Sequence, residues 1–386
     1  MSHPCSPPAA DLAAVRPIGG PVCPPLAGGG KLHGSETPAV SRPVLLCGYY
    51  GEHNLGDDAL LEALLRQLPA TVRPVVTAFD QAGVEQRHRV ATVQRRSLRA
   101  VLAATGRCRA LVLGGGSLLQ DSTSARSLLY YAALIIATRL QGKPVLLWAQ
   151  GLGPLRRRGS RWLVRLLLAI TPLISWRDAA SARFARRLGR VAPHGADAVW
   201  ALAPQQWLGR GGPIVVCWRP TGLISDAGWA ICLQALAALA ERHDRQVLWL
   251  PFHRHQDQGL LERFAQAGLL PESLRLRSRE LPAERPAEAM AVFRSAGLVV
   301  AMRLHALILA ALSGSPTTAL SYDPKVQACA IEFGCRCIDL SDPLPPADAL
   351  SSSWSEDLDR PAPRAAIEQM QAATALHHQL LQHLEA

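Results

Sequence analysis

In the second half of the chain, two short segments carry side chains that can bind an anion and transfer a proton. Arg303 and His305 directly follow one apolar run of the sequence. Ser321 and Lys325 follow the next apolar run. A guanidinium binds carboxylate or phosphate through two parallel hydrogen bonds, an ammonium adds a further cation, and an imidazole gives or takes a proton near neutral pH. These residue types predict a site that holds a small anion and protonates it.

The elements that must position these residues are two strands and the helix between them. Residues 298–302 are apolar and short enough to form a buried parallel strand. Residues 306–312 are expected to form an apolar helix, and 317–320 a second strand. Ligands of open α/β sheets bind outside the carboxyl ends of the strands, which is where the four side chains would lie.

A glycine-rich loop near the start of the ordered chain is a second candidate. It follows the predicted strand 44–47 and contains Gly51, Asn54 and Asp57 before a helix begins. Glycines let the backbone approach a ligand, and the free N–H groups of a helix start attract anions. An ordinary strand-to-helix turn with capping side chains is the alternative interpretation.

A second glycine-rich loop strengthens the binding interpretation. The predicted strand 110–113 runs into three glycines, which include Gly115 and Gly116. Ser117 and Asp121 follow and could cap a helix or bind a ligand. Two such loops in one domain favour a ligand site more strongly than either loop alone.

A further arginine is expected at a strand end in the first half of the chain. Arg177 comes directly after the predicted strand 173–175. Its position suits an anionic ligand. Pairing with Asp178, or with a neighbouring carbonyl, is the structural alternative.

Charge and composition limit the possible partners. The 386 residues have a formal net charge of +11, which favours anionic partners. Nucleic acid is disfavoured because aromatic residues are only 5% of the chain and no nucleic-acid-binding motif is present. The basic segment 156–161 is interpreted as a solvated helix face, with contact to an anionic lipid headgroup as the alternative.

Cysteine use and hydropathy indicate a soluble cytoplasmic protein that could touch the membrane surface. The nine cysteines are scattered and odd in number, so we expect reduced thiols. Cys335 and Cys337 lack a second pair for zinc, and the loop histidines His253 and His255 are not expected to bind a metal. No apolar run reaches the roughly 20 residues of a membrane span.

Four segments are predicted along the chain. Residues 1–42 are rich in Pro, Gly and Ala and are interpreted as a disordered leader. Residues 43–208 and 209–345 each alternate strands with helices, which predicts two doubly wound, Rossmann-like α/β domains facing across a cleft. Residues 346–386 are expected to form a linker and a C-terminal helix, which could reach back across the domains.

Several motifs occur in an order and spacing typical of one enzyme family. They are GYYGEHNLGDDALL, LVLGGGSLLQD, WAQGLGPL, SWRD, MRLHALI and SYDPKV, and they extend from about 44 to 326. Together they resemble the polysaccharide pyruvyl transferases, in particular the S-layer-associated bacterial branch. The chain departs from the family pattern in the aromatic residues Trp176 and Trp218, a difference that bears on the acceptor and not on the chemistry.

The resemblance implies a fold, a reaction and its substrates. The fold would be GT-B-like, with phosphoenolpyruvate as the donor, a sugar as the acceptor and no metal or cofactor. Such enzymes form a pyruvate ketal that bridges two sugar hydroxyls, and they release phosphate. In the S-layer-associated branch the acceptor is a lipid-diphosphate-linked cell-wall intermediate that contains N-acetylmannosamine.

The resemblance also implies roles for individual residues. The family's donor-binding arginines and its acid histidine fall by motif on Arg177, Arg303 and His305. Lys325 and Ser321 would complete the donor site. The acceptor is assigned to the two glycine-rich loops, through Gly51, Asn54, Asp57, Gly115, Gly116, Ser117 and Asp121.

Two other functions remain open at this stage, because architecture does not fix function. A GT-B glycosyltransferase that uses a nucleotide-sugar donor is the first alternative. A non-catalytic protein that binds sugars or lipid phosphates on the same scaffold is the second. The basic net charge is compatible with all three.

Overall fold

The computed structural model describes residues 42–122 and 124–385. The leader predicted for residues 1–42 lies outside these residues, apart from Arg42. Among the helices described, none combines the length and the apolar character that crossing a bilayer requires.

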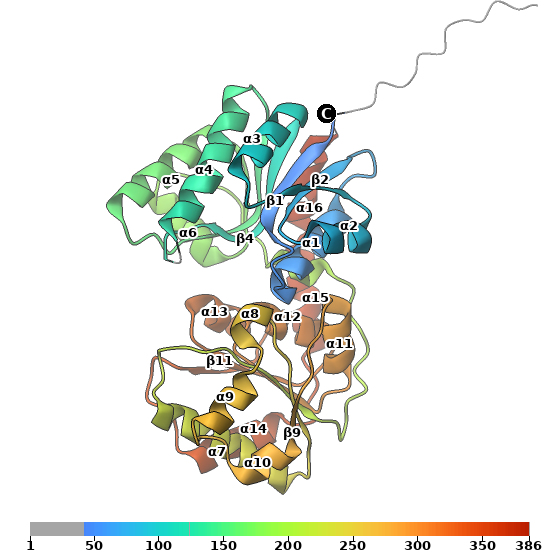
Figure 1. Cartoon of the computed structure of the whole chain (residues 1–386), viewed down its shortest axis with the longest axis vertical. Helices are drawn as coiled ribbons and strands as arrows, with labels where there is room; N and C mark the ends of the chain where they lie inside the picture. Colours follow the sequence, from blue (N-terminus) through green and yellow to red (C-terminus); the bar gives the residue numbers. More distant parts are fainter. Residues whose placement is uncertain (1–41, 123, 386) are drawn as a thin grey trace, which may run out of the picture. The chain divides into compact units, whose positions relative to one another are not determined.

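The first half of the chain forms a parallel six-stranded sheet in the order β3-β2-β1-β4-β5-β6 (Figure 1). Its strands are β1 (Val44–Tyr50), β2 (Pro74–Ala78), β3 (Ala91–Gln94), β4 (Ala110–Leu119), β5 (Val145–Leu152) and β6 (Leu173–Trp176). Its helices are α1 (Leu55–Gln67), α2 (Gln81–His88), α3 (Leu98–Arg107), α4 (Ala125–Leu140), α5 (Arg158–Ile170) and α6 (Ala179–Arg187). The 3₁₀ turn η1 (Ala198–Ala201) follows.

The second half forms another parallel six-stranded sheet, in the order β12-β11-β10-β7-β8-β9. Its strands are β7 (Ile214–Cys217), β8 (Val247–Trp249), β9 (Ser278–Glu280), β10 (Leu298–Ala301), β11 (Thr317–Ser321) and β12 (Arg336–Asp339). Its helices are α7 (Asp226–Arg242), α8 (Arg254–Asp257), α9 (Leu260–Gln266), α10 (Glu272–Arg277), α11 (Pro286–Arg294), α12 (Leu304–Leu312), α13 (Pro324–Glu332) and α14 (Ala347–Asp357).

Both sheets have the strand order of a doubly wound Rossmann-like fold. The order reverses between β1 and β4 in the first sheet and between β7 and β10 in the second. Ligands of such sheets bind at this reversal, outside the carboxyl ends of the strands. The predicted pair of doubly wound α/β sheets is therefore confirmed. The domain limits at 208/209 and 345/346 stay predictions.

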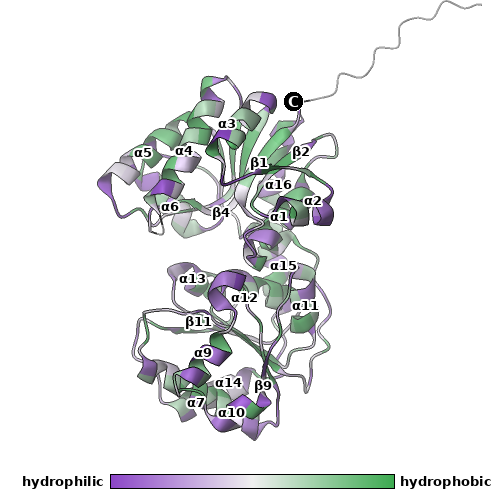
Figure 2. Ribbon diagram, in the orientation of Figure 1, coloured by the Kyte–Doolittle hydropathy of each residue, from purple (hydrophilic) through white to green (hydrophobic). Residues whose placement is uncertain are grey.

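The central strands are buried on both faces, which explains their continuous apolar runs (Figure 2). Successive side chains point to opposite faces. In β1, Leu46 packs into a cluster with α1 and α2, whereas Leu45 packs into a cluster with α3, α4, α5 and α6. The first of these clusters also contains Val215 of the second sheet and Leu307 of α12. One continuous apolar core therefore contains residues of both sheets.

The second glycine-rich segment is strand and not loop. β4 continues through its glycines to Leu119 and pairs with β5, with a register irregularity between Gly116 and Leu119. Gly115 and Gly116 have φ values of 76° and 72°, which few other residues adopt. The prediction that these glycines form a loop after the strand was thus wrong, because pairing with β5 holds them in the sheet.

The C-terminal helix predicted to reach back does so as two helices, α15 (Arg364–Ala373) and α16 (Ala375–Leu381), followed by η2 (Gln382–Leu384). α16 packs on β5 and β6 of the first sheet. The imidazole of His377 lies 2.8 Å from Ser175 Oγ and 2.8 Å from the Ala196 carbonyl oxygen. Trp148 Nε1 donates to the His377 carbonyl at 3.1 Å. The buried His377 thereby joins α16 to the segment that follows α6.

Candidate active site

Arg177 lies at the carboxyl end of β6 and is only 7% exposed. Its backbone N–H donates to the Gln150 carbonyl at 3.0 Å, which fixes the strand end against β5. Nε donates to Asp178 at 3.0 Å, and Nη2 lies 3.4 Å from Ser117 Oγ. Asp178 also caps α6 through Ser181. The structural alternative, pairing with Asp178, is therefore present. The Nη2 atom of the same guanidinium points to Ser117 in β4.

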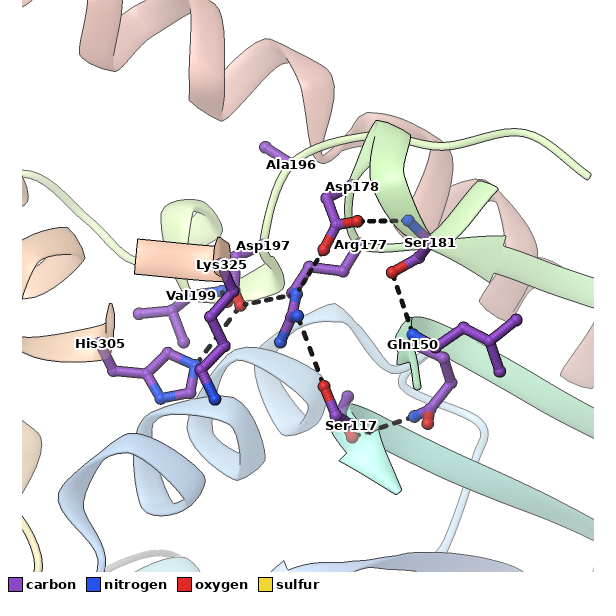
Figure 3. Close-up of polar contacts among 12 residues, drawn as sticks. Ser117, Gln150, Arg177, Asp178, Ser181, Ala196, Asp197, Val199, His305 and Lys325 are labelled. Atoms are coloured by element: carbon purple, nitrogen blue, oxygen red, sulfur yellow. Dashed lines mark hydrogen bonds and ion pairs between the residues drawn. The ribbon is translucent and has the colours of Figure 1, made fainter. Parts of the chain in front are cut away.

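Asp197 is the residue that connects Arg177 with His305. It is 6% exposed, and its Oδ2 lies 3.8 Å from Arg177 Nε and 3.4 Å from His305 Nε2 (Figure 3). Its Oδ1 accepts from the Val199 N–H at 3.0 Å. Burial alone would raise the pKa of Asp197, but the His305 imidazole and then the Arg177 guanidinium outweigh it and lower the pKa to about 2. Asp197 is thus a buried anion between the permanently charged guanidinium of Arg177 and the imidazole of His305.

His305 occupies the first turn of α12 and faces the start of α1. A Cβ atom at Gly56 would overlap His305 Nδ1, so glycine is required there to admit the imidazole. Among the described residues, neither His305 Nε2 nor Asp197 Oδ2 has a hydrogen-bond partner in good geometry, although both atoms are buried. Such unpaired atoms are costly unless a ligand or water completes them. The two atoms lie 3.4 Å from each other, so they form an ion pair when the imidazole is protonated.

Asn54 and Asp57 bring the first glycine-rich loop to the same place. Asn54 Oδ1 caps α1 by accepting from the Gly56 N–H at 3.1 Å, and its amide donates to Asp57 Oδ2. Burial raises the pKa of the Asp57 carboxyl to about 6, although His305 acts in the opposite direction. Asp57 and Asp197 are therefore two carboxyls with pKa values moved apart, an arrangement typical of acid–base sites.

The ends of β4 and β5 lie against the cluster of Arg177 and Asp57. A Cβ at Gly151 would lie 2.5 Å from Ser117 Oγ and 2.6 Å from Arg177 Nη2. A Cβ at Gly116 would lie 3.9 Å from Asp57 Oδ1. Gly151 thus leaves room for the Ser117 hydroxyl and the Arg177 guanidinium, whereas a Cβ at Gly116 would make only an ordinary contact with Asp57.

Lys325 reaches the cluster from the second sheet, in the first turn of α13. Figure 3 labels Lys325 in the same view as Arg177 and His305, and its charge, like that of His305, lowers the pKa of Asp57. Its Nζ lies 3.3 Å from Asp323, which caps α13. Ser321 is buried, and its hydroxyl donates to the Asp323 carbonyl at 3.1 Å.

Three of the predicted residues have other partners. Arg303 pairs with the buried Asp257, which Nε contacts at 3.0 Å, and also donates to Gln256. Asp121 accepts the backbone N–H groups of Arg156 and Arg157 at 2.7 and 2.9 Å. A Cβ at Gly51 would meet the backbone after β2 at 2.9 Å, so this glycine allows close packing. The functional roles of all three stay predictions.

Asp197, Gly56 and Gly151 are the site residues that the sequence did not single out. Gly56 and Gly151 lie within motifs already described, and a glycine beside a charged strand end is a usable signal. Asp197 lies in an irregular segment that follows α6. Its only signal is the capping pattern of an aspartate before a short helix.

A cavity of about 930 Å³ lies next to this cluster, and its lining includes Asp58, Arg87, Arg254 and Glu284. Asp58 is the neighbour of Asp57 on α1, but Arg177, Asp197 and His305 do not line the cavity. Its charged groups pair among themselves, with Arg87 3.4 Å from Asp58 and Arg254 3.1 Å from Glu284. We therefore place the reactive groups at the cluster and not in this cavity.

Comparisons with known proteins agree with the fold and with the motifs. A family model described as polysaccharide pyruvyl transferase matches residues 54–324. Similar solved structures include the UDP-GlcNAc 2-epimerase of Methanocaldococcus jannaschii (TM-score 0.59, 9% identity, 89% of this chain and 99% of that chain). A putative UDP-N-acetylglucosamine 2-epimerase from Listeria monocytogenes has a TM-score of 0.57 at 13% identity, covering 89% and 97%. Anabaena Alr3699/HepE, solved with UDP and glucose, has a TM-score of 0.55 at 12% identity, covering 89% and 98%. No curated protein sequence matches the chain.

Proposed function

Since the chain belongs to the polysaccharide pyruvyl transferase family, we propose that it transfers the pyruvyl group of phosphoenolpyruvate to a sugar of a cell-wall or exopolysaccharide precursor. The product is a ketal, and phosphate is released. The low identities to the solved structures concern the fold alone. The proposal is therefore supported by the family and by the side chains of this chain.

The observation that carries the proposal is the cluster of Arg177, Asp197 and His305. Phosphoenolpyruvate has up to three negative charges, so its site needs fixed cations, and a buried guanidinium is permanently charged. Arg177 and Lys325 supply these charges, while the imidazole of His305 lies 3.4 Å from Asp197. The cluster thus joins anion binding to proton transfer at one place.

The reaction needs one proton to arrive and two sugar protons to leave. Protonation of C3 of the donor turns its methylene into a methyl group and gives C2 oxocarbenium character. One sugar oxygen then bonds to C2, the C2–O bond to phosphate breaks, and the second sugar oxygen takes the place of phosphate. Of the two hydroxyl protons, one replaces the proton used at C3 and the other leaves with phosphate.

His305 is the proposed acid that protonates C3. Asp197 would hold the imidazole in one orientation and stabilise its protonated form, because it stays ionised at any working pH. A positioned acid contributes roughly 10²–10⁴-fold to the rate. Asp57, whose pKa is raised to about 6, is the proposed base for a sugar hydroxyl.

The remaining predicted residues take supporting roles in the proposal. Arg303 would have to exchange Asp257 for the donor before it could bind phosphate, so we assign it to holding the loop before α8. Gly116, Ser117 and Asn54 border the cluster on the side of the first sheet, and we assign the acceptor to that side. An S-layer-type, lipid-diphosphate-linked acceptor is the finer assignment, and it depends on the sequence motifs.

The test is a phosphate-release assay with phosphoenolpyruvate and lipid-linked or synthetic glycan acceptors, with mass spectrometry of the glycan. We expect phosphate release and one added pyruvyl group. His305→Ala should lower both by roughly 10²–10⁴-fold, while the protein still unfolds in one cooperative transition. His243→Ala is the matched control. His243 follows α7, which packs on the second sheet, and its imidazole contacts Ser355 of α14. This substitution should leave turnover unchanged.

A nucleotide-sugar glycosyltransferase is the competing function, since Anabaena HepE was solved with UDP and glucose. UDP- and CMP-sugars are therefore assayed in parallel. Glycosyl transfer from either of them, without phosphate release from phosphoenolpyruvate, would replace the proposed function. Full turnover by His305→Ala would instead remove the acid role from this residue.

A further inference from the structure

The exposed side of α5 combines basic and apolar side chains in one stripe. Arg158, Arg161, Trp162, Arg165 and Leu166 are all exposed and recur at helical spacing. Trp162 is 69% exposed and Leu166 is 42% exposed. The opposite side of the same helix packs into the core of the first sheet. α5 is therefore an amphipathic helix whose outer side is itself partly apolar.

The exposure of Trp162 is unusual within this protein. The chain has nine tryptophans, and the other eight are buried or half-buried. A large aromatic side chain in water forgoes the stabilisation that burial gives it. Trp162 lies among arginines, so a partner of this surface must bind an apolar ring and several positive charges together.

The neighbouring helix α4 extends the apolar part of this surface. α4 packs beside α5 (Figure 1). Its Leu129 is 59% exposed and its Leu140 is 83% exposed. Four large apolar side chains thus project from two adjacent helices on one face of the first sheet.

The charge of this region has one sign. Residues 156–190 contain ten arginines and one acidic residue, Asp178. In the part of the chain that the structure describes, Arg177 is the one arginine of these ten in an ion pair, and it belongs to the site above. The other nine leave their charge available to an external anion.

We propose that the outer face of α4 and α5, with the arginines around it, docks the protein on an anionic lipid bilayer. Tryptophan favours the boundary between headgroups and acyl chains, and exposed leucines insert beside it. Arginines near the surface strengthen the attraction by anionic lipids. A nucleic acid would bind the arginines through its phosphates, but it would not give the exposed leucines an apolar surface to contact.

The surface is connected to the active site through short structural links. α5 follows β5, which carries Gly151, and the turn before α5 is fixed by Asp121, whose carboxylate accepts from Arg156 and Arg157. α6 follows Arg177. A bilayer bound to α5 would therefore lie near the strand ends that carry the reactive groups. The docking itself does not depend on the reaction, so either proposal can fail alone.

The experiment is flotation of the full chain with vesicles of phosphatidylglycerol and phosphatidylcholine, against vesicles of phosphatidylcholine alone. We expect binding to the anionic vesicles that weakens as salt rises. Arg161→Ala with Arg165→Ala should weaken it tenfold or more. Trp162→Ser with Leu166→Ser should do the same, and brominated lipid should quench the wild-type fluorescence but not the residual fluorescence of this variant.

The matched controls lie on α10, which packs at the other sheet. Leu276→Ser removes a leucine that is 70% exposed, and Arg275→Ala removes an exposed arginine. Each of these variants should bind vesicles like the wild type. Binding that the α5 variants leave unchanged would overturn the proposal. A single-stranded oligonucleotide that binds at the same salt, while vesicles do not, would also overturn it.

Discussion

Replacing Gly151 with alanine tests whether the position of the Arg177 guanidinium determines activity. The new Cβ would lie 2.6 Å from Nη2 and 2.8 Å from Cζ of Arg177, and 2.5 Å from Ser117 Oγ, whereas ordinary contacts begin at 3.4 Å. The guanidinium must therefore move by about 0.8 Å. A misplacement of about 1 Å in a site costs roughly 10²-fold. We expect kcat/KM for phosphoenolpyruvate to fall by about that factor.

The assay is phosphate release at several phosphoenolpyruvate concentrations, together with calorimetric binding of phosphoenolpyruvate alone. Weaker donor binding should account for most of the loss, because Arg177 is assigned to the donor. The thermal unfolding temperature should change little, since the clashing atoms belong to side-chain ends that can shift.

Gly106→Ala is the matched control for this substitution. Gly106 lies within α3, and a Cβ there meets nothing within 4 Å. Activity should be unchanged, and stability should rise by about 0.5–1 kcal/mol from the better helix propensity. If Gly151→Ala had wild-type kcat/KM and wild-type donor affinity, the guanidinium would not be the donor-binding group.

Three further substitutions probe the carboxyls and the imidazole. Gly56→Ala should displace His305 and lower kcat with little effect on donor binding, as measured by phosphate release and calorimetry. Asp197→Asn should cost roughly 2–3 kcal/mol of unfolding free energy. Because the pKa of Asp197 is lowered, this loss should be present above the ordinary value of 3.8 and should shrink as pH falls through about 2, so denaturant titrations at pH 5 should show a larger loss than titrations at pH 2. Asp57→Asn should remove an activity decline that occurs as pH falls through about 6, and a pH–rate profile that retains this decline would exclude Asp57 as the base.

The strand ends could be predicted from sequence because their apolar runs are continuous. A strand that is buried on both faces appears in the sequence as a continuous apolar run, so it can be recognised without a structure. The polar residues that follow it then lie at the carboxyl edge of the sheet. This reasoning located Arg177 and His305 on elements far apart in the chain. The structure places both within 4 Å of one Asp197 oxygen.

Sequence spacing failed where the direction of a side chain decides its partner. Arg303 has extended backbone and precedes α12, whereas His305 lies within the first turn of that helix. The two side chains therefore point to different neighbours although they are two positions apart. Asp197 was missed for another reason, since it lies in an irregular segment and only tertiary contacts bring it between Arg177 and His305.

The contact between His377 and Ala196 has a consequence for biosynthesis. α16 comes after both sheets in the chain, yet its imidazole holds the backbone next to Asp197. While the polypeptide grows on the ribosome, both sheets are complete before this brace exists. The carboxylate that we propose orients His305 is consequently secured late, which would delay competence for turnover until α16 has been translated and has packed on β5 and β6.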